Sequence, residues 1–439
     1  MKIFSKTLSL LILLILICVF YFYEIKYSAK REKKEEGSKK VFIVEKNEIK
    51  SIIINNEDKK IELVSLNNQW FVKDKNYECD KNEIESLLNK IISLQINRNL
   101  GEIEDLTQYG LTDSKKFIEI KYNGTKQTLF IGGQTPSGSY LYTTKDKKNV
   151  YLVYKWDLND IIEKDMFDLV DKRILPVEIK KSDIEQIEIK NKVYFLVRRK
   201  GDIWNFEKPI NDWADKEKID NFLDKIINGK IKSFEEDKKE KDCGLEKPKI
   251  IISLKTKDKE YFLHFGKKVN ETYYCKNSLK PYIFLVEENL LEMPDEINAL
   301  REKKLFDFNI SDLIEFSIIK KGKELKIVKD GEKYYNESDK HKKISKEKVE
   351  EFLSDIKYLE IKDFISYSET NLKKYGLSSP LIRIIVKYNK TKTEIHFGTK
   401  TEKDIYCYHP ERKIIFTIPS SDYSKIDKDF DFFIEKSNE

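Results

Sequence analysis

Glycine and proline are scarce in this sequence. Its 439 residues include 15 Gly and 9 Pro, which is about half the usual share or less. This scarcity excludes collagen-like repeats and disordered regions rich in these two residues. Hydrophobic residues make up 40% of the chain and aromatic residues 12%, so the chain can form hydrophobic cores. At this length we expect about two to four domains.

Motifs that would indicate an enzyme or a metal site are missing as well. The sequence contains no Gly-x-Ser-x-Gly and no His-Glu-x-x-His, the signatures of serine hydrolases and zinc proteases. None of its 5 cysteines forms the closely spaced pair of a zinc or redox motif. We therefore predict no catalytic residue, no metal site and no cofactor. General acid–base catalysis stays open, because some pair among 77 Asp and Glu residues will always be suitably spaced.

Concentrated positive charge, which a nucleic-acid binder needs, is missing from most of the chain. The 83 Lys and Arg residues exceed the 77 Asp and Glu residues, for a net charge of +6. Nine Lys or Arg and four Glu lie within residues 1–40, so most of this excess belongs to the N-terminus and the remaining chain is nearly balanced. This distribution argues against nucleic acid as a partner.

A long hydrophobic run lies near the N-terminus. Residues 7–23 read TLSLLILLILICVFYFY and carry no charge over 17 positions, the short end of the range for a membrane-spanning helix. Two lysines precede the run, as in a secretory signal, but the bulky side chain of Tyr27 disfavours cleavage after Ala29. We predict an uncleaved, single-pass transmembrane helix over about 7–23, with residues 1–40 as the anchor and its basic flank and the lipid bilayer as its partner.

Two signals conflict over the side of the membrane on which the rest of the chain lies. The basic flank over 26–40 would stay in the cytoplasm by the positive-inside rule. A short basic N-terminus before one apolar helix is, however, typical of exported proteins, and long domains are translocated largely regardless of charge. We expect the body of the protein to lie outside the cytoplasm at the cell membrane.

Three copies of one unit follow the anchor. Tyr109-Gly110-Leu111 recurs as Cys243-Gly244-Leu245 and as Tyr375-Gly376-Leu377, with glycine spacings of 134 and 132. A second glycine follows each of these by 22 residues, and a tyrosine follows that glycine by 8. Copies one and two also have a tryptophan 40 residues before the first glycine, and copy three has two tyrosines near this position. These repeated residues are Gly132, Gly266 and Gly398, then Tyr140, Tyr274 and Tyr406, then Trp70 and Trp204, and Tyr334 and Tyr335 in copy three. Matching offsets of this kind predict an internal triplication.

Each copy also has the same mixture of helix and strands. Apolar residues recur at i, i+3, i+4, i+7 and i+8 from Ile84 and from Ile219, and copy three keeps most of this pattern from Val349. Such spacing predicts a helix with one buried stripe, and the N-caps are expected at Asp80, Asp215 and Ser345. Segments such as FIEIKY, IIISLK and RIIVKY have strand composition. Helices and strands that share a unit without regular alternation predict an α+β fold with antiparallel sheets.

The repeat length sets the expected domain organisation. We predict three tandem homologous α+β domains over 41–176, 177–308 and 309–439, each within the usual size range. The two joins are short and not rich in Gly or Ser, so long flexible linkers are not expected.

Most of the repeated residues have a structural explanation. The Tyr-Gly-Leu glycines are expected to end helices in the left-handed conformation. The run 132–139 resembles a phosphate-binding loop, but it lacks the required lysine and a Tyr-rich strand follows it instead of a helix. Cys275 and Cys407 share a column with Leu141, which predicts buried thiols and leaves a disulfide between domains as an open alternative.

Histidines and tyrosines supply the remaining candidates. His264 and His396 share one column with Phe130, without neighbouring metal ligands in the sequence. The tyrosine column of Tyr140, Tyr274 and Tyr406 is the candidate binding feature, because exposed aromatic rings can stack on sugars or partner proteins. Packing within the domain is the more common role of a strand tyrosine.

With these residues in view, the chain resembles a bacterial family called domain of unknown function 4340. The resemblance depends on Trp70, the helix after Asp80, the Tyr-Gly-Leu motif, the hairpin ending at Gly132, and the segment 171–175 that recurs at 302–305. It covers nearly the whole chain after the anchor. Members of this family look like membrane-anchored envelope proteins that are often encoded beside transporters of the ATP-binding-cassette (ABC) type. The resemblance therefore implies an accessory role, and no catalytic residues come with it.

These observations lead to three hypotheses of function. The leading one is a non-enzymatic, membrane-anchored accessory or scaffold protein of the cell envelope, which presents its three domains to an ABC-type transporter or another envelope protein. The second is an extracytoplasmic module that binds a glycan or a lipid through the tyrosine column. The third is an envelope hydrolase without a recognisable motif.

Overall fold

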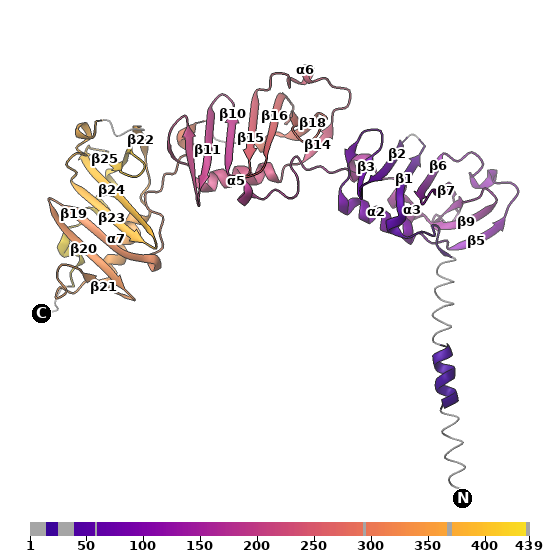
Figure 1. Cartoon of the computed structure of the whole chain (residues 1–439), viewed down its shortest axis with the longest axis horizontal. Helices are drawn as coiled ribbons and strands as arrows, with labels where there is room; N and C mark the ends of the chain where they lie inside the picture. The colour runs from indigo at the N-terminus through magenta and orange to yellow at the C-terminus, as the bar shows by residue number, and fades with distance from the viewer. Residues whose placement is uncertain (1–14, 25–38, 58, 293–295, 367–370, 436–439) are drawn as a thin grey trace, which may run out of the picture. The chain divides into compact units, whose positions relative to one another are not determined.

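The computed structural model describes residues 15–24, 39–57, 59–292, 296–366 and 371–435. Within these ranges the chain forms three antiparallel sheets, each accompanied by helices (Figure 1). This confirms the predicted α+β class with antiparallel sheets. The chain divides into two compact units, Met1–Lys172 and Arg173–Glu439, of which the first contains one sheet and the second contains two.

Only part of the predicted membrane anchor is described. Residues 15–24 are helical, whereas residues 7–14 of the predicted transmembrane helix lie outside the described residues. Among the helices that the structure does describe, none is both long enough and apolar enough to cross a membrane.

The first unit holds repeat 1, whose sheet has the strand order β4-β3-β2-β1-β6-β7-β8-β9-β5. Most neighbours are hairpin partners, but β1 pairs with β6 and β5 pairs with β9 at the far edge. The chain must therefore cross the end of the sheet between β5 and β6. The elements are η1 (Lys46–Glu48), β1 (Ile49–Asn56), β2 (Lys59–Leu66), β3 (Gln69–Val72), β4 (Tyr77–Glu78), α2 (Lys81–Ser93), β5 (Arg98–Glu102), η2 (Thr107–Tyr109), β6 (Lys116–Tyr122), β7 (Thr125–Gln134), β8 (Tyr140–Thr144), β9 (Asn149–Tyr154), α3 (Lys155–Ile162) and α4 (Met166–Leu169).

Repeat 2 opens the second unit and repeats this topology, with the order β13-β12-β11-β10-β15-β16-β17-β18-β14. All of its strands lie within the range predicted for the second domain. Its elements are η3 (Lys181–Asp183), β10 (Gln186–Lys190), β11 (Tyr194–Lys200), β12 (Ile203–Lys208), β13 (Asp212–Trp213), α5 (Lys216–Ile227), β14 (Ile231–Phe234), α6 (Glu240–Cys243), β15 (Ile250–Lys255), β16 (Glu260–Val269), β17 (Thr272–Asn277), β18 (Phe284–Glu287), η4 (Glu288–Leu291) and η5 (Ile297–Leu300).

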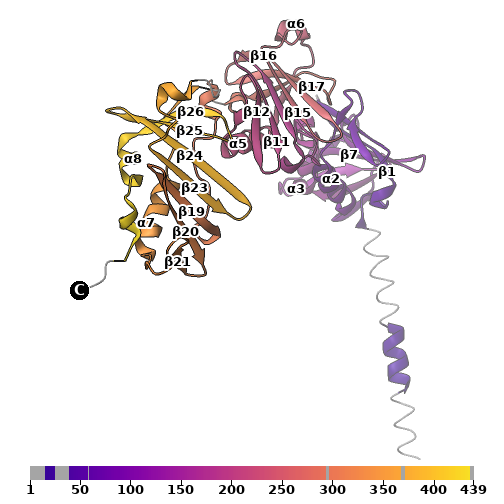
Figure 2. The same cartoon turned by 60° about the vertical axis from the view of Figure 1, so that its left-hand side comes forward.

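Repeat 3 completes the second unit with the order β21-β20-β19-β23-β24-β25-β26-β22. Figure 2 shows α7 and α8 on the same side of this sheet. Its elements are η6 (Ile310–Asp312), β19 (Leu313–Lys320), β20 (Lys323–Asp330), β21 (Lys333–Asn336), α7 (Lys346–Lys357), β22 (Asp363–Ser366), η7 (Leu372–Tyr375), β23 (Ile382–Tyr388), β24 (Thr391–Lys400), β25 (Asp404–His409), β26 (Ile414–Pro419), α8 (Ser420–Ile426) and η8 (Phe430–Phe433).

The predicted amphipathic helices and their caps are confirmed. The carboxylate of Asp80 accepts hydrogen bonds from the backbone N–H groups of Asn82 (2.8 Å) and Glu83 (3.1 Å), so it satisfies two donors that the first turn of α2 leaves free. Asp215 and Ser345 cap α5 and α7 with one such hydrogen bond each. The apolar stripe of each helix is buried against its own sheet. These stripes are Ile84, Leu87, Leu88 and Ile91; Ile219, Phe222, Leu223 and Ile226; and Val349, Phe352, Leu353 and Ile356.

A joining segment, residues 300–305, connects repeats 2 and 3 and is hydrogen-bonded to both. The N–H of Glu302 donates to the carbonyl of Trp213 in repeat 2 (3.1 Å), and the N–H of Leu305 donates to the carbonyl of Leu359 in repeat 3 (3.1 Å). Both halves of this join are therefore held by backbone pairing.

Candidate functional site

The first glycine of the repeat signature ends a short helical turn in every repeat. Gly110, Gly244 and Gly376 have φ values of 65°, 74° and 69° and form the C-caps of η2, α6 and η7. This left-handed conformation strongly favours glycine. The predicted helix-ending role is confirmed, although the elements are single turns.

The second glycine of the signature contacts the same turn. A Cβ added to Gly132, Gly266 or Gly398 would lie 2.2, 2.1 or 2.3 Å from the carbonyl oxygen of the residue before the first glycine. That distance is impossible for a real side chain, so the two glycines form one backbone-to-backbone contact. The contact holds the crossing chain against β7, β16 or β24. The signature glycines therefore have a role in folding.

The structure corrects the predicted tyrosine column. The pairs Phe130↔Thr144, His264↔Lys276 and His396↔Tyr408 are equivalent rungs. In repeats 2 and 3 the tyrosine of the column, Tyr274 or Tyr406, lies two residues before the second member of this pair. The residue at the same position in repeat 1 is Tyr142, not Tyr140. The β7–β8 connection of repeat 1 is two residues longer than its counterparts, and this shifts the spacing. For the same reason Thr143, and not Leu141, is the equivalent of Cys275 and Cys407.

The corrected column packs on the signature turn. The ring of Tyr142 lies 4.7 Å from that of Tyr109, and Tyr406 lies 4.7 Å from Tyr375 (centroid distances). Tyr274 packs on a buried cluster that includes Cys243. Each member of the column therefore has a packing role within its own repeat.

Tryptophan and cysteine side chains also have structural positions. Trp204 is buried and its indole N–H donates to the carboxylate of Asp220 (3.3 Å), and Trp70 is half-buried at the same place in repeat 1. Four cysteines outside the N-terminal segment are free and buried. Burial raises the pKa of the Cys79 thiol to about 12 and also raises the pKa values of the thiols of Cys243, Cys275 and Cys407. These thiols therefore lack the thiolate character of reactive cysteines.

The two histidines that share a column occupy equivalent rungs, as predicted. Nε2 of His396 lies 2.7 Å from a carboxylate oxygen of Glu394. Burial lowers the pKa of His264. Across the described residues, His, Cys, Asp and Glu side chains do not gather into groups of three that could hold a metal ion.

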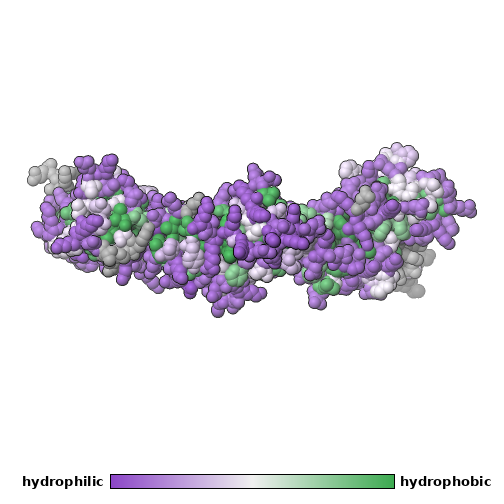
Figure 3. Space-filling view, turned by 90° about the horizontal axis from the view of Figure 1, so that it is seen from above, coloured by the Kyte–Doolittle hydropathy of each residue, from purple (hydrophilic) through white to green (hydrophobic). Residues whose placement is uncertain are grey.

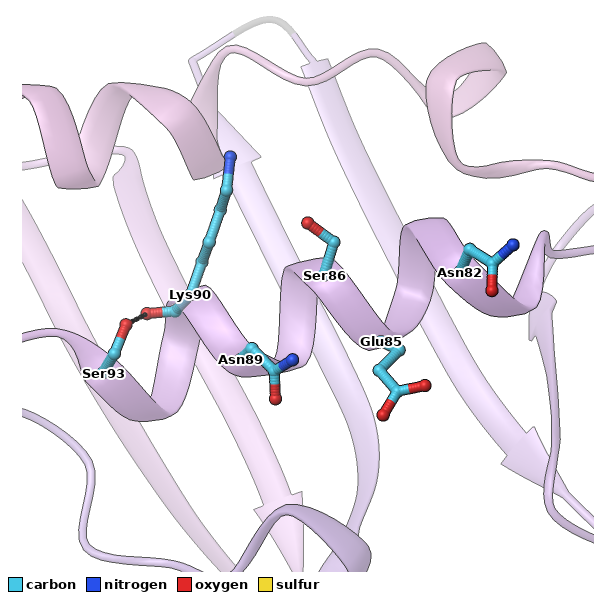
Figure 4. Close-up of a pocket in the computed structure, with 6 residues that line it drawn as sticks. All are labelled: Asn82, Glu85, Ser86, Asn89, Lys90 and Ser93. Atoms are coloured by element: carbon cyan, nitrogen blue, oxygen red, sulfur yellow. Dashed lines mark hydrogen bonds between the residues drawn. The ribbon is translucent and has the colours of Figure 1, made fainter.

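Two hollows on the surface are shallow and open. One of about 520 Å³ lies over the outward face of α2. Figure 4 shows Ser86 and Lys90 pointing to one side of this helix and Glu85 and Asn89 to the other, so the side chains do not converge. A second hollow of about 510 Å³ lies beside Gly110 and Gly132. The face drawn in Figure 3 is mostly hydrophilic, with small separate hydrophobic patches.

The most unusual chemistry is a buried charge cluster between repeats 2 and 3. Both oxygens of Asp212, on β13, accept hydrogen bonds from the guanidinium group of Arg412, at 2.7 and 2.9 Å. Nε of Arg301, from the joining segment, donates to Oδ2 of the same carboxylate at 2.6 Å. All three side chains have 0% exposure. Two cations and one anion thus lie together without contact with solvent.

Aromatic rings and backbone groups surround this joint cluster, which we define as Asp212, Arg301 and Arg412. The guanidinium of Arg301 lies 3.4 Å from the ring centroid of Phe364, and that of Arg412 lies 5.4 Å from the ring of Trp213. Such stacking stabilises cations that water cannot reach. Arg412 also donates to the carbonyl of Glu302 (2.9 Å), so repeat 2, the joining segment and repeat 3 all take part.

His409 lies at the edge of the joint cluster and is 1% exposed. Its ring centroid is 5.3 Å from that of Trp213, and neither ring nitrogen has a hydrogen-bond partner within the described part of the chain. Burial, followed by the positive charge of Arg412, lowers the pKa of His409 to about 3. The ring is therefore neutral in the folded protein.

Sequence reasoning missed the joint cluster for an identifiable reason. By backbone pairing, the residues equivalent to Arg301 are Val170 in repeat 1 and Ile434 in repeat 3. Asp212 lies two residues before the backbone partner of Arg301, and the residues equivalent to it are Tyr77 and Lys342. The charges are thus specific to one joint, whereas the sequence signal was what the copies share.

Comparison with protein-family models gives the same threefold pattern. The model described as Domain of unknown function (DUF4340) matches residues 70–214, 204–380 and 338–438. The chain belongs to the DUF4340 family. The three matches confirm the tandem copies, and the first two begin at Trp70 and Trp204 and extend into the following DUF4340 repeat. No curated protein and no solved structure matches the chain.

The glycine contact of a DUF4340 repeat predicts a steric cost. Gly266→Ala places a Cβ against the carbonyl oxygen of Cys243, so we expect a loss of about 1–3 kcal/mol in the free energy of unfolding, as for other overpacked sites. Gly201→Ala is the control, because a Cβ at Gly201 would have no neighbour within 4 Å and only the φ of 62° is unfavourable for alanine. We expect this backbone strain to lower the free energy of unfolding by about 1 kcal/mol. Urea unfolding followed by circular dichroism measures both, and equal losses would contradict the contact.

The joint cluster predicts an electrostatic cost. Asp212→Asn removes the carboxylate that two buried guanidinium groups share, so we expect a loss of about 3–5 kcal/mol from the unit that holds repeats 2 and 3. Glu85→Gln is the matched control, because its ion pair with Lys46 (2.8 Å) is exposed and should change stability by less than about 1 kcal/mol. Differential scanning calorimetry measures the change, and an unchanged melting profile in Asp212→Asn would refute the prediction.

His409 predicts a pH dependence with a definite sign. Below the ordinary histidine pKa of 6.5 the unfolded chain binds a proton that the folded protein excludes until about pH 3, so stability falls as pH is lowered through this window, by about 1.4 kcal/mol per pH unit. His409→Phe removes this contribution, and its stability should decline less between pH 7 and pH 4. His341→Phe, at an exposed position, should follow the wild type. Parallel profiles for all three proteins would contradict the assignment.

Proposed function

We propose that this DUF4340 protein is a non-enzymatic accessory or scaffold protein of a bacterial cell envelope. In this proposal residues 7–23 anchor it in the membrane as a single-pass helix, and the repeats lie outside the cytoplasm. The observation that carries the scaffold role is the use of the repeated residues. The signature glycines, the corrected tyrosine column and the buried thiols all stabilise the repeats themselves.

The joint between repeats 2 and 3 supports the same role. A scaffold must hold its modules in fixed positions, and the joint cluster does this with a carboxylate shared by two guanidinium groups. Removal of Asp212 would take the shared carboxylate away from two buried cations, which is costly. A partner of the ABC-transporter type is the class that the family resemblance implies, and it is part of this proposal.

The alternatives have less support. A glycan- or lipid-binding module that uses the tyrosine column would need free ring faces, whereas Tyr142 and Tyr406 pack on the signature turns. An envelope hydrolase would need a nucleophile or a polarised base, and the four buried cysteines have raised pKa values instead.

The anchor and its orientation are tested in one experiment. The full-length protein, with a C-terminal epitope, is produced in bacteria, and the membranes are washed at alkaline pH. We expect it to stay in the membrane fraction, and protease added to wall-stripped cells should digest the repeats. Leu14→Arg with Ile17→Arg should release it, because two charges in the apolar run are costly, whereas Leu14→Ala with Ile17→Ala should not.

Two outcomes would contradict this proposal. Release of the wild-type protein by the alkaline wash would refute the anchor. Full protection of the epitope from protease, in cells whose surface control is digested, would refute the orientation. The partner is tested by affinity capture from detergent-solubilised membranes, where failure to recover ABC-transporter subunits above the level of the double-arginine variant would reject that class.

A further inference from the structure

Three aromatic residues lie at the open end of the β8–β9 hairpin in repeat 1, and two of them are exposed. Tyr140 and Tyr154 face each other across the two strands, with ring centroids 4.8 Å apart and ring planes at 24°. Trp156 follows two residues later at the start of α3 and is 80% exposed, while Tyr154 is 43% exposed. We call Tyr140, Tyr154 and Trp156 the aromatic trio.

The other two repeats provide an internal control for this trio. The rung that pairs Tyr140 with Tyr154 corresponds to Thr272↔Glu287 in repeat 2 and to Asp404↔Pro419 in repeat 3. Two residues further on, the place of Trp156 is taken by Asn289 and by Ser421. The fold therefore forms without aromatic side chains at these positions, so the shared architecture does not require them.

Repeat 1 is also the repeat that follows the apolar N-terminal run. Residues 24–38, a stretch of 15 residues, separate that run from Lys39. A chain of this length spans at most roughly 50 Å, which is enough for repeat 1 to reach the surface of the bilayer that holds the run. The stretch contains Lys26, Lys30 and Arg31 among other basic residues, and positive charge of this kind is attracted to anionic lipid headgroups.

The chemistry of the trio fits the headgroup level of a bilayer. Tryptophan and tyrosine concentrate there because their rings are apolar and their N–H and O–H groups stay hydrated. Polar groups accompany the rings, since the ammonium of Lys155 donates to the side-chain oxygen of Gln134 (3.0 Å) and the N–H of Lys155 donates to the carbonyl of Ser139 (3.0 Å). The residue between Tyr154 and Trp156 is therefore held in place by two hydrogen bonds.

We infer that the aromatic trio is a lipid contact, through which repeat 1 lies on the membrane that holds residues 7–23. This inference rests on the anchor in the proposed function and adds the repeat and the side chains that touch lipid. Repeats 2 and 3, which have no aromatic residue at the equivalent positions, have no such contact.

Tryptophan fluorescence gives a direct test, because the chain has 4 tryptophans and none lies in residues 7–23. The full-length protein is reconstituted in phosphatidylcholine–phosphatidylglycerol vesicles with or without bromine on the acyl chains, which quenches only tryptophans that contact lipid. We expect brominated lipid to lower the emission of the wild type and to leave that of Trp156→Phe unchanged. Asn289→Trp, which places an indole at the equivalent position of repeat 2, should add emission that bromine does not quench.

The outcomes separate the lipid contact from the anchor. If the protein floats with the vesicles but the wild type and Trp156→Phe are quenched equally, the aromatic trio does not touch lipid while the anchor stands. If the protein does not float, the anchor fails and the lipid contact fails with it. If Trp156 is shielded from acrylamide in native membranes but is not quenched by brominated lipid, the trio binds a protein and the inference is overturned. Because Trp156 is so exposed, its substitution should not unfold repeat 1.

Discussion

The chain of each repeat has to leave the edge strand of its sheet and return to the centre, and the signature glycines make that crossing possible. In repeat 1 the path from β5 to β6 runs over β7, where the carbonyl of Tyr109 lies against Gly132. Any side chain at Gly132 would lift the crossing chain away from the strand. The closeness of two backbones thus determines where the strands on both sides of the crossing can lie, and repeats 2 and 3 depend on the same contact.

Much of this fold is predictable from sequence because it depends on local patterns. The apolar stripe from Ile84, its cap at Asp80 and the left-handed Gly110 all follow from spacing and from the conformational preferences of single residues. The extent and order of the sheets do not, because antiparallel pairing across the repeat is set by contacts between distant strands. The tyrosine column shows a further limit, since two extra residues in one hairpin moved the structural equivalent from Tyr140 to Tyr142 without disturbing the pattern elsewhere.

The joint cluster was beyond sequence reasoning for a different physical reason. Asp212 and Arg412 are 200 residues apart, and in a chain with 36% charged residues no single charge attracts notice. Only the folded structure shows that these charged side chains are buried away from solvent. The repeats are therefore alike in what holds each one together, whereas the cluster between repeats 2 and 3 uses residues that the copies do not share. Comparison of the copies identifies the first kind of residue and conceals the second.

Backbone pairing of the joining segment also bears on how the chain would respond to mechanical force. A pull between repeats 2 and 3 acts along residues 300–305, which are hydrogen-bonded to Trp213 on one side and to Leu359 on the other. The segment cannot lengthen like a spring until those bonds and the ion contacts of Arg301 break together. Tension applied to repeat 3 would therefore be transmitted to repeat 2 with little extension of the segment between them.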